Sequence, residues 1–108
     1  VGTKVIVVLG HTKCGAIVGA CNHVEMGNLT TLLNKIQPAI YQEKETQENR
    51  TGSNPVFVRN VTEINIDLTM ERIRRESPII AELETEGKIK IVGGMYDVET
   101  GMVTFHPY

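Results

Sequence analysis

The feature that most limits how this chain can fold is a nearly continuous run of β-branched residues near its start. Residues 3–9 read TKVIVVL, and Gly10 follows directly. A run of this kind is typical of a strand that is buried on both faces, as in a parallel sheet. Residues 88–93 (KIKIVG) form a second apolar run, and residues 102–106 (MVTFH) form a third, shorter one. The sequence therefore predicts a sheet whose first two strands are separated by most of the chain.

Helical spacing of apolar residues follows the first predicted strand. We expect one helix to begin at Cys14 and to end at Gly27. Its apolar face would hold Ile17, Ala20, Cys21 and Val24. A second helix is expected over residues 29–45, and Pro38 inside it predicts a kink or a break. Residues 43–54 are polar without an apolar period, which predicts a solvated helix end and a loop.

Residues 55–76 fit two different patterns. Their apolar residues recur with helical spacing, although Ile64, Ile66 and Leu68 alternate as they would in a strand. We favour a helix because the helical pattern continues to Ile73.

The C-terminal part of the chain predicts a short helix followed by a hairpin. The helix is expected over residues 78–87, where Gly87 ends it. The turn at residues 98–101 joins the second and third predicted strands so closely that they should pair antiparallel. The fold class is therefore α/β, with a partial parallel sheet flanked by helices and a C-terminal antiparallel hairpin strand. We expect residues 1–108 to form a single domain.

Composition and charge exclude several classes of partner. The chain has 41% hydrophobic and 22% charged residues and a net charge of −2, which argues against a nucleic acid or an anionic membrane as main partner. No apolar run approaches the roughly 18 residues of a membrane span. Two cysteines and no secretory signal pattern predict a reducing compartment, the cytoplasm. Because the chain enters a strand almost directly after Val1, we expect an upstream part to be missing.

A histidine and a cysteine flank the point where the first predicted strand gives way to a helix. Imidazole nitrogen and thiolate sulfur are preferred ligands of zinc. His11 and Cys14 also stand at the carboxyl end of a predicted parallel strand, where α/β sheets usually bind ligands. The following helix directs backbone N–H groups at Cys14, which favours the thiolate. The alternatives are a small buried cysteine beside a hydrogen-bonded histidine, or a cysteine nucleophile.

The other possible zinc donors lie too far from this pair. Cys21 is seven residues past Cys14, which is roughly 10 Å along a helix, and it shares the apolar helix face, so it should pack in the core. We expect His23 to be a surface residue and His106, on the last strand, not to bind metal. Because a catalytic zinc needs about three protein ligands and an open position, at least one ligand must come from elsewhere.

The stretch VIVVLGHTKCGAIVGAC resembles the second metal-binding segment of the β-class carbonic anhydrases, in which a G-H-x-x-C-G-A turn follows a buried strand. The resemblance continues, in the family's order, through GNLTTLLNKIQPAI, VRNV and SPIIAELETEGKIKIVGGMYDVETGMVTF. It implies a zinc lyase, a carbonate dehydratase that interconverts CO2 and bicarbonate and that works as a homodimer or a higher homo-oligomer. It further implies that His11 and Cys14 are two of the zinc ligands and that Gly15 lies beside the substrate pocket.

The sequence departs from the family in one large respect. It has no match to the C-x-D-x-R segment that supplies the remaining cysteine ligand and an Asp–Arg pair. The chain therefore resembles the C-terminal half of the catalytic domain, without a complete catalytic set, and should be inactive alone. Such a partial sheet exposes an edge and an apolar face, so we expect it to self-associate. Tyr96 matches a tyrosine that helps to bind bicarbonate in some relatives, although a packing role is expected here.

Two other functions remain open. One is a non-catalytic module that serves oligomerisation or is attached to a larger protein such as a transporter. The other is a redox or transfer domain that uses the thiol of Cys14.

Overall fold

Within the described residues, the sheet has three strands in the order β1-β2-β3. The computed structural model describes residues 2–106. Strand β1 (Val5–His11) pairs parallel with β2 (Lys90–Tyr96), and β2 pairs antiparallel with β3 (Val103–Phe105). The predicted α/β class, with its parallel pair and C-terminal hairpin strand, is confirmed. The first two strands begin two residues later than predicted and run further toward the loops that follow them.

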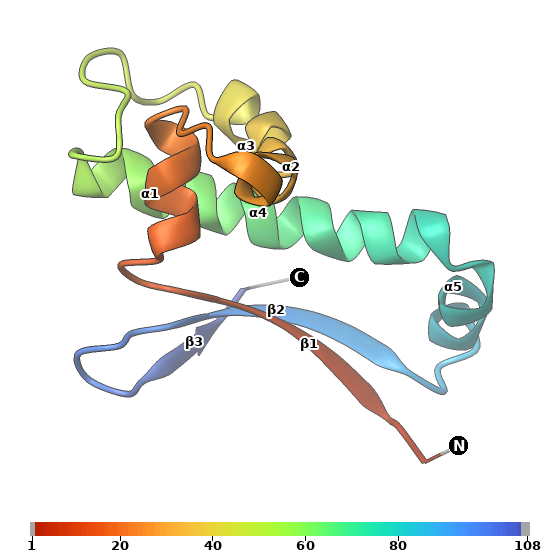
Figure 1. Cartoon of the computed structure of the whole chain (residues 1–108). Helices are drawn as coiled ribbons and strands as arrows, with labels where there is room; N and C mark the ends of the chain where they lie inside the picture. Colours follow the sequence, from red (N-terminus) through yellow and green to blue (C-terminus); the bar gives the residue numbers. More distant parts are fainter. Residues whose placement is uncertain (1, 107–108) are drawn as a thin grey trace.

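Five helices lie between β1 and β2 in the described part of the chain. They are α1 (Gly15–Cys21), α2 (Gly27–Asn34), α3 (Gln37–Gln42), α4 (Pro55–Glu76) and α5 (Pro78–Thr85). Helix α4 runs along one face of the sheet, and α1, α2 and α3 lie on the opposite side of α4 (Figure 1). The molecule therefore has three layers, with α4 in the middle. Within residues 2–106, no helix combines the length and the apolar character that crossing a membrane requires.

Helix α4 confirms the helical prediction for residues 55–76. The Asn54 side chain accepts hydrogen bonds from the backbone N–H groups of Val56 (3.1 Å) and Phe57 (3.4 Å), and a proline occupies the first turn. Both features are typical of helix starts. The predicted helix over residues 29–45 consists of two helices, α2 and α3, and Pro38 lies in the first turn of the second one. The predicted break is thus confirmed.

The helix expected from Cys14 to Gly27 is shorter than predicted. Helix α1 ends at Cys21, and His23 has a φ of +54°, a left-handed conformation that an α-helix does not tolerate. Gly27, with a φ of +49°, begins α2 and does not end α1. Val24 therefore lies outside the helix, 36% exposed, and the prediction that it belongs to the apolar helix face is wrong.

Helix α4 contributes to two separate hydrophobic clusters. Phe57 and Val61 belong to a cluster shared with α1, α2 and α3, and Ile64 and Leu68 pack against it. Ile66 belongs to the second cluster, which α4 shares with the sheet. Because α4 is covered on both sides, its apolar residues do not form a single stripe. This explains why residues 64–68 alternate as they would in a strand.

Strand β1 is buried on only one face. Ile6 and Val8 pack against the cluster between α4 and the sheet, whereas Val5, Val7 and Leu9 are 50%, 48% and 50% exposed. The prediction of a strand buried on both faces is therefore wrong for the described residues, in which no element covers the second face. The exposed apolar face that the resemblance implied is confirmed.

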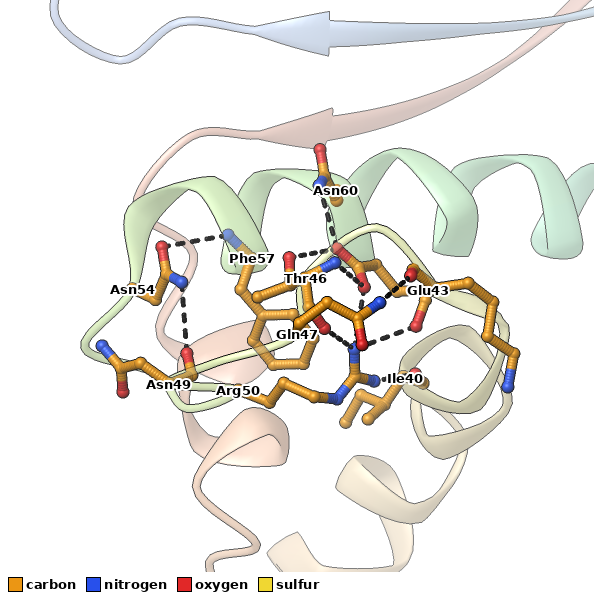
Figure 2. Close-up of polar contacts among 10 residues, drawn as sticks. Ile40, Glu43, Thr46, Gln47, Asn49, Arg50, Asn54, Phe57 and Asn60 are labelled. Atoms are coloured by element: carbon orange, nitrogen blue, oxygen red, sulfur yellow. Dashed lines mark hydrogen bonds and ion pairs between the residues drawn. The ribbon is translucent and has the colours of Figure 1, made fainter.

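A buried carboxylate connects the end of α3 to α4. The Glu43 side chain is 1% exposed and accepts hydrogen bonds from Arg50 Nη1 (2.9 Å), Thr46 Oγ1 (2.5 Å) and Asn60 Nδ2 (2.9 Å), as Figure 2 shows. Since Asn60 belongs to α4, these bonds hold the loop after α3 against that helix.

Arg50 completes this network from within the loop. Its guanidinium donates to the backbone carbonyls of Ile40 (2.8 Å), Glu43 (3.0 Å) and Thr46 (2.9 Å). It also lies 4.6 Å from the ring centroid of Phe57 on α4. One side chain thus satisfies carbonyl groups at the C-terminus of α3 and packs against the core aromatic residue.

We expect the stability of the protein to fall in acid through Glu43. Burial raises the pKa of this carboxyl, but the hydrogen bonds from Thr46, Asn60 and Arg50 outweigh burial and lower the pKa from 4.5 to about 2. The stabilisation of the folded state by ionised Glu43 is therefore fully present above the unfolded pKa of 4.5, and it is lost as the pH falls toward 2. It amounts to about 3 kcal/mol.

Urea unfolding of Glu43→Gln and of the wild type, measured between about pH 6 and pH 2, tests this prediction. The variant should be less stable near neutral pH and should lose less stability in acid. Glu63→Gln is the control because the Glu63 side chain is 42% exposed. Parallel acid profiles for Glu43→Gln and the wild type would contradict the assignment.

Candidate metal centre

The two predicted zinc ligands lie on either side of one turn at the carboxyl end of β1. His11 is the last residue of β1, and Cys14 is the N-cap residue of α1. Both line one cavity of about 290 Å³, which Gly10, Thr62 and Ile66 also line. The structure therefore brings His11 and Cys14 to the same cavity, at the place in the fold that the sequence predicts.

His11 also lines a larger cavity of about 450 Å³, together with Thr12, Lys13 and Arg59. Cys14 does not belong to the described lining of that cavity. The larger cavity contains two cationic side chains, but each is already paired, Lys13 with Glu99 and Arg59 with Glu63. The smaller cavity is the one that joins the two donors.

The imidazole of His11 is oriented by one backbone contact. Its Nδ1 lies 2.8 Å from the carbonyl oxygen of Thr12. Because a carbonyl oxygen can only accept, Nδ1 carries the proton, and in the neutral ring Nε2 then holds the lone pair. Metal-binding histidines commonly donate their other ring N–H to a backbone carbonyl in this way. The chemistry at His11 therefore fits a metal ligand.

The two cysteines have different surroundings. Cys14 is half-buried and packs at the margin of the hydrophobic cluster that α4 shares with α1, α2 and α3, here called the α1–α3 cluster. Cys21 is 1% exposed inside that cluster, and burial raises the pKa of its thiol to about 11. Cys21 is thus a core residue, as predicted. Cys14 is the thiol with access to the cavity.

The turn between the two donors is held by the turn that follows β2. The backbone N–H of Thr12 donates to the Tyr96 carbonyl (2.9 Å), and the N–H of Val98 donates to Thr12 Oγ1 (3.0 Å). Lys13 has a φ of +55° and forms an ion pair with Glu99. These contacts could not be predicted from the sequence. The only sequence feature that could have indicated them is the hydroxyl of Thr12, between His11 and Cys14, and a hydroxyl has many possible partners.

The remaining predicted residues lie away from the pair or beside it. His23 is exposed, as predicted. His106 Nδ1 lies 3.0 Å from Asp67 Oδ1, which connects the end of β3 to α4. The position of a Cβ on Gly15 would meet nothing within 4 Å, so the space beside it is open, and its role in a substrate pocket stays a prediction. Tyr96 is half-buried at the end of β2.

Among residues 2–106, no group of three or more His, Cys, Asp or Glu side chains gathers in a way that could hold a metal ion. The nitrogen and sulfur of His11 and Cys14 fit zinc chemically. A site with about three protein ligands needs a further donor in addition to them. The ligand roles of His11 and Cys14 stay a prediction.

Comparisons with known proteins give a consistent result. The carbonic anhydrase family model matches residues 1–103. One of two tetrameric β-carbonic anhydrases from Sordaria macrospora is 23% identical, with a TM-score of 0.78 over 97% of this chain and 53% of its own. For the Coccomyxa β-carbonic anhydrase in complex with acetazolamide, the identity is 19% and the TM-score 0.76, over 94% of this chain and 46% of its own.

The β-carbonic anhydrase CafA of Aspergillus fumigatus is 21% identical, with a TM-score of 0.74 over 95% of this chain and 48% of its own. At these identities, the similarity to solved structures shows the fold. The chain spans about half the length of these structures. A comparison with curated proteins gives no match.

Proposed function

This chain belongs to the carbonic anhydrase family and has the fold of its β-class members, and we propose that the protein catalyses the zinc-dependent, reversible hydration of CO2 to bicarbonate. The observation that carries the proposal is the shared cavity at the end of β1, which His11 and Cys14 both line. In this proposal His11 Nε2 and Cys14 Sγ hold the zinc ion. A further donor comes from outside the described residues.

The residues of this chain prepare the site in two ways. A bound zinc ion lowers the pKa of water to about 7 and so supplies a nucleophile at neutral pH. The Thr12 carbonyl keeps the His11 proton on Nδ1, so that Nε2 would offer its lone pair to a bound zinc ion. The cavity lining is mostly apolar, which suits an uncharged, nonpolar substrate such as CO2. Its apolar members are Val8, Leu9, Ala16, Ile17, Ile36 and Ile66.

We also propose that the protein is a homodimer or a higher homo-oligomer. Val5, Val7 and Leu9 form an exposed apolar row on β1, which either residues outside this chain or a second copy would remove from water. The structures similar to this chain include a tetrameric enzyme. A cytoplasmic location is proposed because Cys14 and Cys21 are both free thiols, which suits a reducing compartment.

Zinc analysis combined with a CO2 hydration assay tests the catalytic proposal. The complete protein should contain about one zinc ion per catalytic site. Its hydration activity should disappear with a chelator and return with zinc. The 108-residue chain alone should bind zinc weakly and show no measurable hydration, because His11 and Cys14 are two ligands of the roughly three that a catalytic zinc needs.

Rapid hydration by the 108-residue chain would contradict the incomplete ligand set. A complete protein that has neither zinc nor hydration activity would refute the catalytic proposal. That result would favour a non-catalytic module of the same fold.

A further inference from the structure

We propose that Thr12 is a positioning residue, which sets His11 and Cys14 for metal binding through hydrogen bonds to the turn after β2. The inference rests on the proposed function, because it assigns a role to Thr12 within the same site. We call the contacts that join residues 11–13 to residues 96–99 the turn clamp.

Thr12 uses three different polar groups in this arrangement. Its N–H donates to the Tyr96 carbonyl (2.9 Å), and its Oγ1 accepts from the N–H of Val98 (3.0 Å). Its carbonyl oxygen lies 2.8 Å from Nδ1 of His11. His11 is opposite Tyr96 in the β1–β2 ladder, so Thr12 extends this pairing one residue beyond the strand. The contact that orients the imidazole is therefore anchored to β2.

The other half of the turn is held in an uncommon backbone conformation. Lys13 has a φ of +55°, which few residues with a side chain adopt. Such a conformation persists where the surrounding structure enforces it, and it is concentrated at functional sites. Here the hydrogen bonds of Thr12 hold the preceding residue to the turn after β2, whereas the ion pair between Lys13 and Glu99 is largely exposed and contributes little. The reversal at Lys13 brings the chain back so that Cys14 lines the same cavity as His11.

A substitution of Thr12 by Val tests the clamp with little change in shape. Valine keeps the branched side chain but removes the oxygen that accepts from Val98. We expect zinc affinity to fall by about 10-fold, the lower end of the effect of removing a ligand's own partner, because valine keeps the backbone carbonyl that contacts His11. The His11 ring should change from one tautomer, protonated on Nδ1, to a mixture. Thr12→Ser retains the hydroxyl and should restore both properties.

Thr100→Val is the matched control. Thr100 Oγ1 accepts from the backbone N–H of Met102 (3.2 Å), within the same β2–β3 connection. This variant also deprives one backbone N–H of a hydroxyl acceptor, but it leaves the contacts of Thr12 intact. We expect its zinc affinity and its His11 tautomer to equal those of the wild type.

Two measurements on the complete protein decide the outcome. Zinc affinity comes from competition with a colorimetric chelator. The tautomer comes from nitrogen-15 NMR of the histidine rings in the zinc-free protein, where no metal fixes the proton, with His11→Gln to assign the signal. The proposal would be overturned if Thr12→Val had the zinc affinity and the His11 tautomer of the wild type. It would also be overturned if Thr100→Val lost as much zinc affinity as Thr12→Val. A wild-type ring protonated on Nε2 would overturn it whether or not the variants fold. A wild type that binds no zinc refutes the proposed function instead, and the tautomer still decides whether the clamp exists.

Discussion

Replacing Arg50 by Met is expected to lower the free energy of unfolding by about 3 kcal/mol. The variant leaves the Glu43 carboxylate, whose side chain is 1% exposed, without its cation. It also removes the donors to the carbonyls of Ile40 and Thr46. The expected loss lies at the lower end of the range for buried ion pairs because the Arg50 side chain is itself 34% exposed. Methionine keeps an unbranched apolar stem that can still contact Phe57. Urea unfolding near neutral pH measures the effect.

Arg59→Met is the matched control for this substitution. The Arg59 side chain is 60% exposed and pairs with Glu63 across one helical turn at 3.4 Å, so its loss should cost less than about 1 kcal/mol. A double variant, Glu43→Leu with Arg50→Met, should be more stable than Arg50→Met alone, because it no longer buries an unpaired charge. Equal stability losses for the two arginine variants would show that water replaces the Arg50 contacts without cost.

Replacing Cys14 by Ser should weaken zinc binding by about 100-fold or more, which exceeds the usual effect of losing an outer partner. A serine hydroxyl does not ionise near neutral pH and is a poor zinc ligand compared with a thiolate. CO2 hydration should disappear with the metal. The fold should change little, because Cys14 is half-buried and serine has nearly the same shape. Zinc content after dialysis, hydration rate and thermal unfolding measure the three effects.

Cys21→Ser gives the opposite pattern and serves as the control. Cys21 is 1% exposed, and a hydroxyl placed in that core should lower stability by roughly 1–3 kcal/mol while the metal stays bound. Unchanged zinc content in Cys14→Ser would show that other residues hold the metal. If Cys21→Ser lost zinc as fully as Cys14→Ser, the effect would be one of folding.

Local patterns predicted much of the fold because neighbouring residues decide them. The spacing of apolar residues over positions 55–76 predicts the helix. It does not explain why residues 64–68 within that helix alternate as they would in a strand. Ile64 and Leu68 face the α1–α3 cluster, and Ile66 faces the sheet. The spacing of apolar residues records that a position is buried, but it does not record which layer buries it. The same limit explains β1, whose apolar run predicted two covered faces although the described residues cover one.

The site could be predicted in part for a similar reason. His11 and Cys14 are close in sequence, and a strand followed by a turn and a helix brings them together without distant partners. The contacts that hold their turn come from residues near position 98, which are 86 positions away from Thr12 in the sequence. The early end of α1 was also hidden, because its left-handed residue is His23 and not a glycine.

The middle position of α4 has a consequence for the two donors. His11 belongs to the sheet, whereas Cys14 packs with the helices on the other side of α4. The distance between the imidazole nitrogen of His11 and the sulfur of Cys14 therefore depends on how far the sheet lies from the layer of α1, α2 and α3. Gly10 helps to set this spacing, since a Cβ there would lie 2.6 Å from Ile66 Cδ1. Under the proposed function, small changes in side-chain volume between α4 and the sheet would change the distance between His11 and Cys14. They would thus change which metal radius the two side chains prefer, while both side chains stay present.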